Sequence, residues 1–180
     1  VDITFDKTAK KITDISLKQY DATAAAKVEP DAEIAAIVKK AQQEADIEGA
    51  KTAGTVERAL FRGSDENADS GSNRGVESTL NNFIADGQRY AMSKQVGEDI
   101  EIGVMNAGGV RADLKGGDVT YKDIFEVQPF GNSVITAKIS GEEFIKALEN
   151  QWQVGSRPRL AMGLSNNVQV VYDQKANKGE

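Results

Sequence analysis

Two short segments of the sequence contain the residues best suited to ligand chemistry. Asn106–Arg111 reads Asn-Ala-Gly-Gly-Val-Arg, and Pro129–Asn132 reads Pro-Phe-Gly-Asn. Gly108 and Gly109 carry no side chains, so the backbone can turn sharply there and a ligand can approach its amides. Arg111 adds a planar guanidinium that suits a phosphate or a carboxylate. The first segment therefore predicts an anion site.

Asn106 and Phe130 extend this chemistry towards an aromatic ligand. The Asn106 amide both donates and accepts, which suits the edge of a base or a ribose hydroxyl. Phe130 stands between proline and glycine, where a turn can present its flat face to a nucleobase. Each feature also has an ordinary structural explanation, as a tight turn, a surface charge or a packed ring. The residues alone therefore indicate a small anionic ligand, with an aromatic group as an option.

The composition excludes several classes of catalytic site. The 180 residues include no cysteine and no histidine, so the chain has no thiolate metal site, no Ser-His-Asp triad and no histidine-bound metal. We therefore expect neither a catalytic residue nor a metal ligand in it. The net charge is −6, whereas nucleic-acid binders need a basic surplus. Nucleic acid is accordingly not an expected partner, although a few arginines suffice for a small phosphate.

The hydrophobic pattern predicts an α+β domain with a mixed sheet that positions these segments. Thr120 and Ser140, each with an acidic residue three positions later, predict capped helices. No apolar run reaches the roughly 18 residues of a membrane span. Asp65, Glu66 and Asp69 lack the spacing of a calcium loop and indicate a solvated one. Strands are predicted at 3–17 as a hairpin and at 52–60, 100–104, 133–139 and 160–172, and helices from Pro30 to Gly49, from Glu77, over 120–127 and from Ser140.

Together these segments resemble the C-terminal domain of the 5'-nucleotidase family, which includes periplasmic UDP-sugar hydrolases, cyclic-nucleotide phosphodiesterases and the animal ecto-5'-nucleotidase. The Asn-Gly-Gly-Arg block followed at this spacing by the Pro-Phe-Gly block is highly specific. The family usually has glycine where Asn81 stands. The resemblance covers about residues 30–173 and is carried by Arg74, Glu77–Asp86, Gly103–Leu114, Gly117–Asn132, Ser140–Phe144 and Ala147–Glu149.

This resemblance implies a layered α/β/β/α domain that binds a nucleotide for a catalytic domain preceding it. In the family, two divalent metal ions, of zinc or manganese type, and the catalytic histidine belong to the N-terminal domain. Carried over residue by residue, Phe130 stacks on the base and Asn106 bonds the base or sugar. Arg74 and Arg111 contact the phosphate or ribose, with Arg62 as the alternative to Arg74, and Gly108 and Gly109 bring the backbone to the ligand.

The resemblance also implies a domain organisation and a location. Residues 1–29 are expected to be the tail of the catalytic domain with a linker, and 30–180 the nucleotide-binding domain, with a connecting helix at 30–46 and a shortened C-terminal end. The chain alone is expected to be inactive, and the full-length protein to be an extracytoplasmic nucleotide hydrolase. Its partners would be a nucleotide or nucleoside and its own N-terminal metallophosphoesterase domain.

Two other functions fit the same sequence. One is a catalytically silent nucleotide-binding module, such as a sensor or an adhesin. The other is a different metallo-esterase of the superfamily, such as a thiosulfate-oxidation esterase. Phe130 favours a nucleoside, because a thiosulfonate has no ring to stack on it. The preferred substrate stays open between a monophosphate, a UDP-sugar, a dinucleotide and a cyclic nucleotide.

Overall fold

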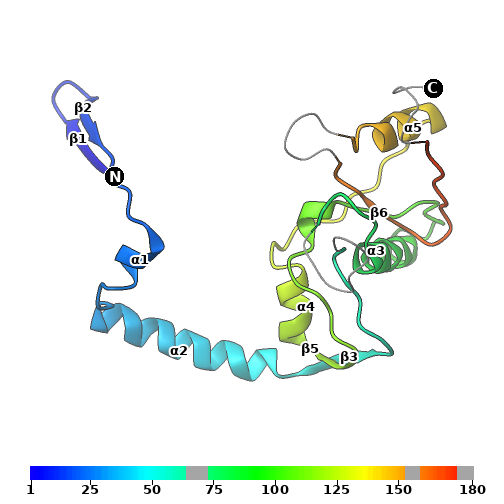
Figure 1. The fold of residues 1–180 in the computed structure, drawn as a ribbon, viewed down its shortest axis with the longest axis horizontal. Helices are drawn as coiled ribbons and strands as arrows, with labels where there is room; N and C mark the ends of the chain where they lie inside the picture. The colour runs from blue at the N-terminus through cyan, green and yellow to red at the C-terminus, as the bar shows by residue number, and fades with distance from the viewer. Residues whose placement is uncertain (64–72, 153–158, 174–180) are drawn as a thin grey trace. The chain divides into compact units, whose positions relative to one another are not determined.

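The computed structural model describes residues 1–63, 73–152 and 159–173 (Figure 1). The chain divides into two compact units, residues 1–44 and 45–180. The acidic residues Asp65, Glu66 and Asp69, predicted to form a solvated loop, lie outside the described residues.

The first unit contains the predicted hairpin. Strands β1 (Asp2–Asp6) and β2 (Lys11–Ser16) pair antiparallel, with a bulge between Thr4 and Phe5. A short helix, α1 (Ala22–Ala25), stands where only a linker was expected.

The long helix α2 (Ala32–Gly49) continues from this unit into the second, and it begins two residues after Pro30. The carboxylate of Asp31 explains this start, because its Oδ1 accepts from the backbone N–H groups of Glu33 and Ile34, each at 3.0 Å. Such side-chain acceptors satisfy amides that have no partner in the first helical turn. The expectation that Pro30 opens the helix was therefore wrong.

The strands of the second unit form two short antiparallel pairs. Strand β3 (Thr52–Val56) pairs with β5 (Gly117–Thr120), and β4 (Val104–Met105) pairs with β6 (Gly163–Leu164). Beyond β3, Leu60 and Leu114 exchange backbone hydrogen bonds of 2.8 and 2.9 Å. With the helices described next, these pairs confirm the predicted α+β class.

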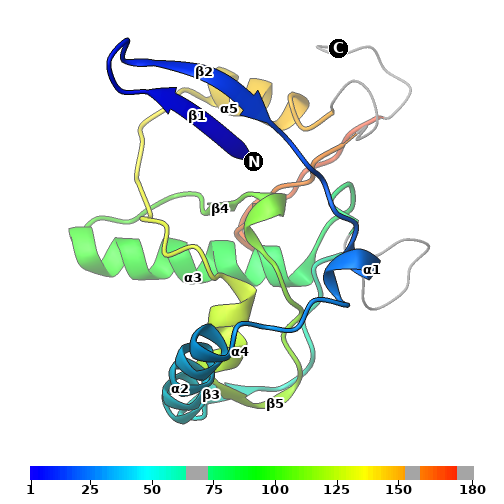
Figure 2. The same ribbon diagram turned by 90° about the vertical axis from the view of Figure 1, so that its left-hand side faces the viewer.

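Three capped helices complete the second unit. Helix α3 (Thr79–Val96) starts at Ser78, whose hydroxyl accepts from the Asn81 N–H. It packs against β6 and against β4, which lies beside it in Figure 2. Helices α4 (Tyr121–Val127) and α5 (Gly141–Glu149) begin with complete capping boxes at Thr120 and Ser140. Both predicted caps are therefore confirmed, because a capping box is decided by residues three positions apart.

Helical spacing predicts a buried stripe on α3 made of Leu80, Phe83, Ile84, Ala91 and Tyr90, and the structure confirms it for buried Leu80 and for Ile84, which packs against the core. Leu80 and Ala85 are buried, together with Asn81, while Phe83 and Tyr90 are 52% and 68% exposed. Helical spacing alone does not fix which face of α3 is buried. The position of β6 does, because the strand comes so close that an added Cβ on Gly163 would lie 2.4 Å from the backbone carbon of Asn81. The close approach of that strand fixes the rotation of α3.

Three predicted strands are absent or much shorter in the described residues. The segment 133–139 has no regular structure, and the side chain of Ile135 is 84% exposed. Of 160–172 only β6 is a strand, and of 100–104 only the first residue of β4. A strand needs a neighbouring strand for its backbone hydrogen bonds, and none is paired with 133–139 in the part of the chain that the structure describes.

The core of the second unit gathers side chains from α3, β4, β5 and α4 and from connecting segments. This core supports the segment Asn106–Arg111, because Met105, directly before the segment, and Val110, within it, belong to the core. The buried residues of this cluster are Leu60, Leu80, Ala85, Met105, Val110, Leu114, Val119 and Val127.

Candidate functional site

The segment Asn106–Arg111 forms a tight turn anchored in the core at both ends. Met105 is 6% exposed and Val110 3%, while Asn106 is exposed. Between them, residues Ala107–Gly109 form a single 3₁₀ turn. The anchoring holds the turn in place and leaves the Asn106 amide accessible to a ligand.

The two glycines of this turn have different structural roles. A Cβ on Gly109 would lie 2.4 Å from Met105 Cε and 2.8 Å from Asn106 Oδ1. A Cβ on Gly108 would lie 3.6 Å from both Arg74 Nη1 and Asn106 Nδ2, which is ordinary contact. Neither glycine has a positive φ. A side chain at Gly109 would therefore displace the ends of the Met105 and Asn106 side chains, and Gly108 is the point where the Arg74 and Asn106 side chains meet.

Arg111 and Phe130 meet through the C-terminal end of α4. The Arg111 N–H donates to the carbonyl of Val127, the last residue of α4, at 2.9 Å, and Phe130 follows three residues later. Gly131, with φ 60°, turns the chain there. The Arg111 guanidinium carbon lies 5.8 Å from the centre of the Phe130 ring, within cation–π range. The ring is 55% exposed, so a flat ligand can still reach it.

The structure distinguishes the two arginines considered for the phosphate side. The half-buried guanidinium of Arg74 lies next to Gly108 in the turn, as the distance above shows. Arg62 instead forms an ion pair, in which its Nε lies 3.1 Å from Asp113 Oδ1. Its Nη1 also donates to the carbonyl of Arg111 at 2.8 Å. Arg62 is thus engaged in internal bonds, while Arg74 borders the candidate site.

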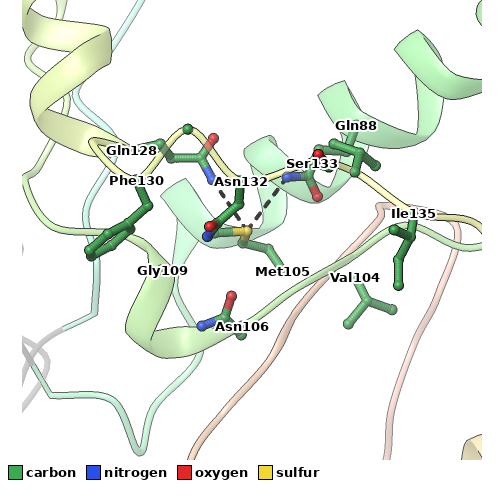
Figure 3. A pocket seen from close by; sticks show the side chains of 12 residues that line it. Gln88, Val104, Met105, Asn106, Gly109, Gln128, Phe130, Asn132, Ser133 and Ile135 are labelled. Carbon is green, nitrogen blue, oxygen red and sulfur yellow. Dashed lines mark hydrogen bonds between the residues drawn. The ribbon is translucent and has the colours of Figure 1, made fainter.

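A pocket of about 620 Å³ opens between the turn, α3 and the segment after α4 (Figure 3). Three of the predicted residues line it: Asn106, Gly109 and Phe130. Gly108, Arg74 and Arg111 lie near these residues without lining the pocket. The full lining is Gln88, Val104, Met105, Asn106, Gly109, Gln128, Phe130, Gly131, Asn132, Ser133, Val134 and Ile135.

Two glutamines in this pocket were missed by sequence reasoning. The side-chain amides of Gln88 and Gln128 both donate to Met105 Sδ, at 3.7 and 3.4 Å (Figure 3, dashed lines). A thioether is a weak acceptor, so these amides can exchange it for a better partner. Gln128 directly precedes the Pro-Phe-Gly block, which was a usable signal. Gln88 lies on α3, far from either motif, and only the fold brings it here.

Two possible features are not found in the described part of the chain. No group of three or more acidic side chains there is placed to hold a metal ion. Nor is any helix within the described ranges long and apolar enough to cross a membrane.

The fold and the pocket define an α+β domain with one candidate ligand site in its described part. The chain belongs to the family described as "5'-nucleotidase, C-terminal domain", which matches residues 51–180. A solved structure titled 5'-nucleotidase precursor from Thermus thermophilus shares the fold, with a TM-score of 0.58 and 23% identity. That similarity covers 91% of this chain and 30% of the solved one.

Three curated relatives show how much of a longer protein this chain represents. Endonuclease YhcR of Bacillus subtilis is 32% identical over 84% of this chain, which spans 11% of that relative. Cell wall protein Lmo0130 of Listeria monocytogenes is 32% identical over 69% of the chain and 16% of the relative. A 5'-nucleotidase of Vibrio cholerae is 42% identical over 34% of the chain and 11% of the relative. The chain thus spans less than a fifth of each relative.

Proposed function

We propose that this chain is the nucleotide-binding domain of an extracytoplasmic, metal-dependent hydrolase of the 5'-nucleotidase type. The observation that carries the proposal is the meeting of Asn106, Phe130 and Arg111 at one anchored turn. Two of them line the same pocket, and the guanidinium of the third lies over the Phe130 ring. The volume of about 620 Å³ falls in the range of roughly 300–1,000 Å³ that is typical of small-molecule sites.

In this proposal each side chain contacts a different part of the nucleotide. The exposed Phe130 ring stacks on the base, and the Asn106 amide hydrogen-bonds the base edge or a ribose hydroxyl. Arg111 has no ion-pair partner among the described residues, so its charge is available to the phosphate or ribose side. Arg74, beside Gly108, supplies a second positive charge close to the turn.

The hydrolysis itself is assigned to a different domain. Two divalent metal ions held by an N-terminal metallophosphoesterase domain of the same protein would activate water and polarise the phosphate. The domain described here would bind base, ribose and phosphate and present the ester to those ions. The name of the Listeria relative, a cell wall protein, supports an extracytoplasmic location.

The endonuclease relative raises the possibility of a polynucleotide substrate. Its name describes a protein of which this chain spans only 11%. The net charge of −6 disfavours the many phosphate contacts that a polynucleotide needs. The pocket of about 620 Å³, lined by one exposed aromatic ring, is better suited to a single nucleotide.

A thermal-shift screen of the full-length natural protein tests this proposal. With metals chelated, AMP, uridine and a UDP-sugar should raise the melting temperature, while thiosulfate and a short single-stranded DNA should not. The nucleotide shifts should disappear in Phe130→Ala. Phe125→Ala is a matched control. Phe125 belongs to α4 and is 53% exposed, much like Phe130, but it does not line the pocket.

The outcomes separate the candidate functions. Nucleotide shifts that survive Phe130→Ala, or shifts with thiosulfate or DNA alone, would refute the proposal. Nucleotide binding without hydrolysis of AMP when zinc or manganese is restored would identify the silent module instead.

A further inference from the structure

Arg62 and Asp113 form a bonded pair immediately behind Arg111, and the proposed function gives them no role. One carboxylate oxygen, Asp113 Oδ1, accepts from both the backbone N–H of Arg62, at 2.9 Å, and its Nε, at 3.1 Å. The remaining end of the guanidinium reaches the Arg111 carbonyl, with Nη1 at 2.8 Å. Arg62 therefore links Asp113 to the backbone of Arg111.

The backbone of Arg111 is consequently fixed on both sides. Its N–H donates to the Val127 carbonyl, and its C=O accepts from Arg62. The bridge between Leu60 and Leu114 holds the same two segments together a few residues away. Only the side chain of Arg111, whose Nη1 donates to the Gly108 carbonyl at 3.5 Å, is left to adjust.

The charges also indicate different roles for Arg62 and Arg111. The Arg62 and Asp113 side chains are 27% and 24% exposed, so their ion pair is partly shielded from water. Asp113 balances the charge of Arg62, and two of the five guanidinium N–H donors, on Nε and Nη1, are already used. The charge of Arg62 is therefore already compensated, whereas the exposed Arg111 forms no ion pair in the described residues.

We infer that Arg62, held by Asp113, is a positioning residue for nucleotide binding that acts through Arg111. This inference rests on the proposed function, since it requires Arg111 to contact the ligand. A binding group whose backbone is fixed before the ligand arrives loses less conformational freedom on binding. Removing Arg62 should therefore weaken binding by loosening Arg111, with no contact of its own to the nucleotide.

A double-mutant cycle on the full-length natural protein tests this inference. The dissociation constant for AMP is measured by calorimetry, with metals chelated, for Arg62→Ala, Arg111→Ala and the double variant. Coupled residues commonly interact enough to change affinity by about 2- to 150-fold. We expect Arg62→Ala to weaken AMP binding within this range, and to have no further effect once Arg111 is alanine.

Two further variants keep the test valid if Arg62→Ala fails to fold. Asp113→Asn, which removes the charge that holds Arg62, should reproduce part of the loss, and Arg62→Lys should restore part of it. Arg58→Ala, an exposed arginine four residues earlier, is the matched control and should leave the affinity unchanged.

The outcomes distinguish this inference from the proposed function. If Arg111→Ala weakens binding and Arg62→Ala weakens it further by the same factor in both backgrounds, Arg62 has only a general structural role and the inference fails alone. If Arg111→Ala leaves the affinity for AMP unchanged, the proposed phosphate-side contact fails, and the inference with it.

Discussion

The turn Asn106–Arg111 and the segment that starts at Ser133 border the same pocket, but they are held very differently. The turn is flanked by buried Met105 and Val110 and is bonded to α4. In the other segment, Val134 and Ile135 also line the pocket, yet they are 44% and 84% exposed and belong to no strand.

This comparison shows that a clear sequence pattern does not by itself ensure a fixed structure. The turn is stable because its own neighbours bury apolar side chains and satisfy backbone groups. The second segment has an equally clear alternating pattern but has no strand beside it. Five substitutions test this difference. They follow in order of decreasing expected effect, with Gly131→Ala set beside Gly103→Ala for comparison.

Gly103→Ala should have the largest effect, because it acts on the anchored side of the pocket. Its Cβ would lie 2.1 Å from the backbone oxygen of Ala85, and overpacking of this kind costs about 3 kcal/mol. Gly131→Ala, on the opposite side, meets no atom within 4 Å but has φ 60°, which costs about 1 kcal/mol. Urea unfolding of the chain measures both, and equal losses would contradict the comparison.

Arg111→Ala should weaken binding without unfolding the domain, because the side chain is exposed and its backbone bonds are kept. Hydrogen bonds to charged groups contribute about 1.5–3 kcal/mol, or roughly 10- to 150-fold in affinity. Steady-state kinetics of the full-length protein with AMP measure the change, and Lys115→Ala serves as the control. An unchanged KM together with an unchanged kcat would remove Arg111 from the site.

Thr120→Ala removes the cap of α4, the helix that leads to Phe130, and should destabilise the domain by about 1 kcal/mol. Hydrogen bonds from the Thr120 hydroxyl and backbone N–H lower the pKa of the Asp123 carboxyl below 3.8. A lowered folded-state pKa stabilises the fold above 3.8, and this contribution is lost as the pH falls through the folded value. The cost of Thr120→Ala should therefore be full at pH 7 and should shrink as the pH falls well below 3.8. A cost that grows on acidification would refute this account of the cap.

Ile135→Ser should have the smallest effect, although Ile135 lines the pocket. A side chain that is 84% exposed loses little on truncation, so stability should change by less than about 0.5 kcal/mol. Binding of AMP should be unchanged within the error of a calorimetric titration. A clear loss of affinity would show that this segment contacts the ligand more closely than its exposure indicates.

The sequence predicted those features that depend on nearby residues. The hairpin and the two capping boxes are decided within a few positions, and the motif residues Asn106 and Phe130 do reach one pocket. The strand at 133–139 was wrong because its pairing depends on chain segments elsewhere. Gln88 was missed for a similar reason, since only the packing of α3 against β4 brings it to Met105.

The choice between Arg62 and Arg74 shows the same limit at the level of single residues. Both are arginines upstream of the main motif, and nothing in their local sequence separates an ion-paired residue from one that borders a pocket. The Arg62–Asp113 pair joins residues that are 51 positions apart. Only the fold reveals that Arg74, the arginine closer to α3 in the sequence, lies beside Gly108.

The central claim, that Phe130 stacks on a nucleobase, is tested most directly by comparing AMP with ribose 5-phosphate, which lacks the base. Calorimetric titrations with metals chelated give both affinities for the natural full-length protein, for Phe130→Ala and for the Phe125→Ala control. Stacking on an aromatic side chain contributes about 1–3 kcal/mol per base, so AMP should bind roughly 5- to 150-fold more tightly than ribose 5-phosphate in the natural protein and in Phe125→Ala. In Phe130→Ala most of that advantage should be lost. An advantage of AMP that is equally large in Phe130→Ala would contradict the account.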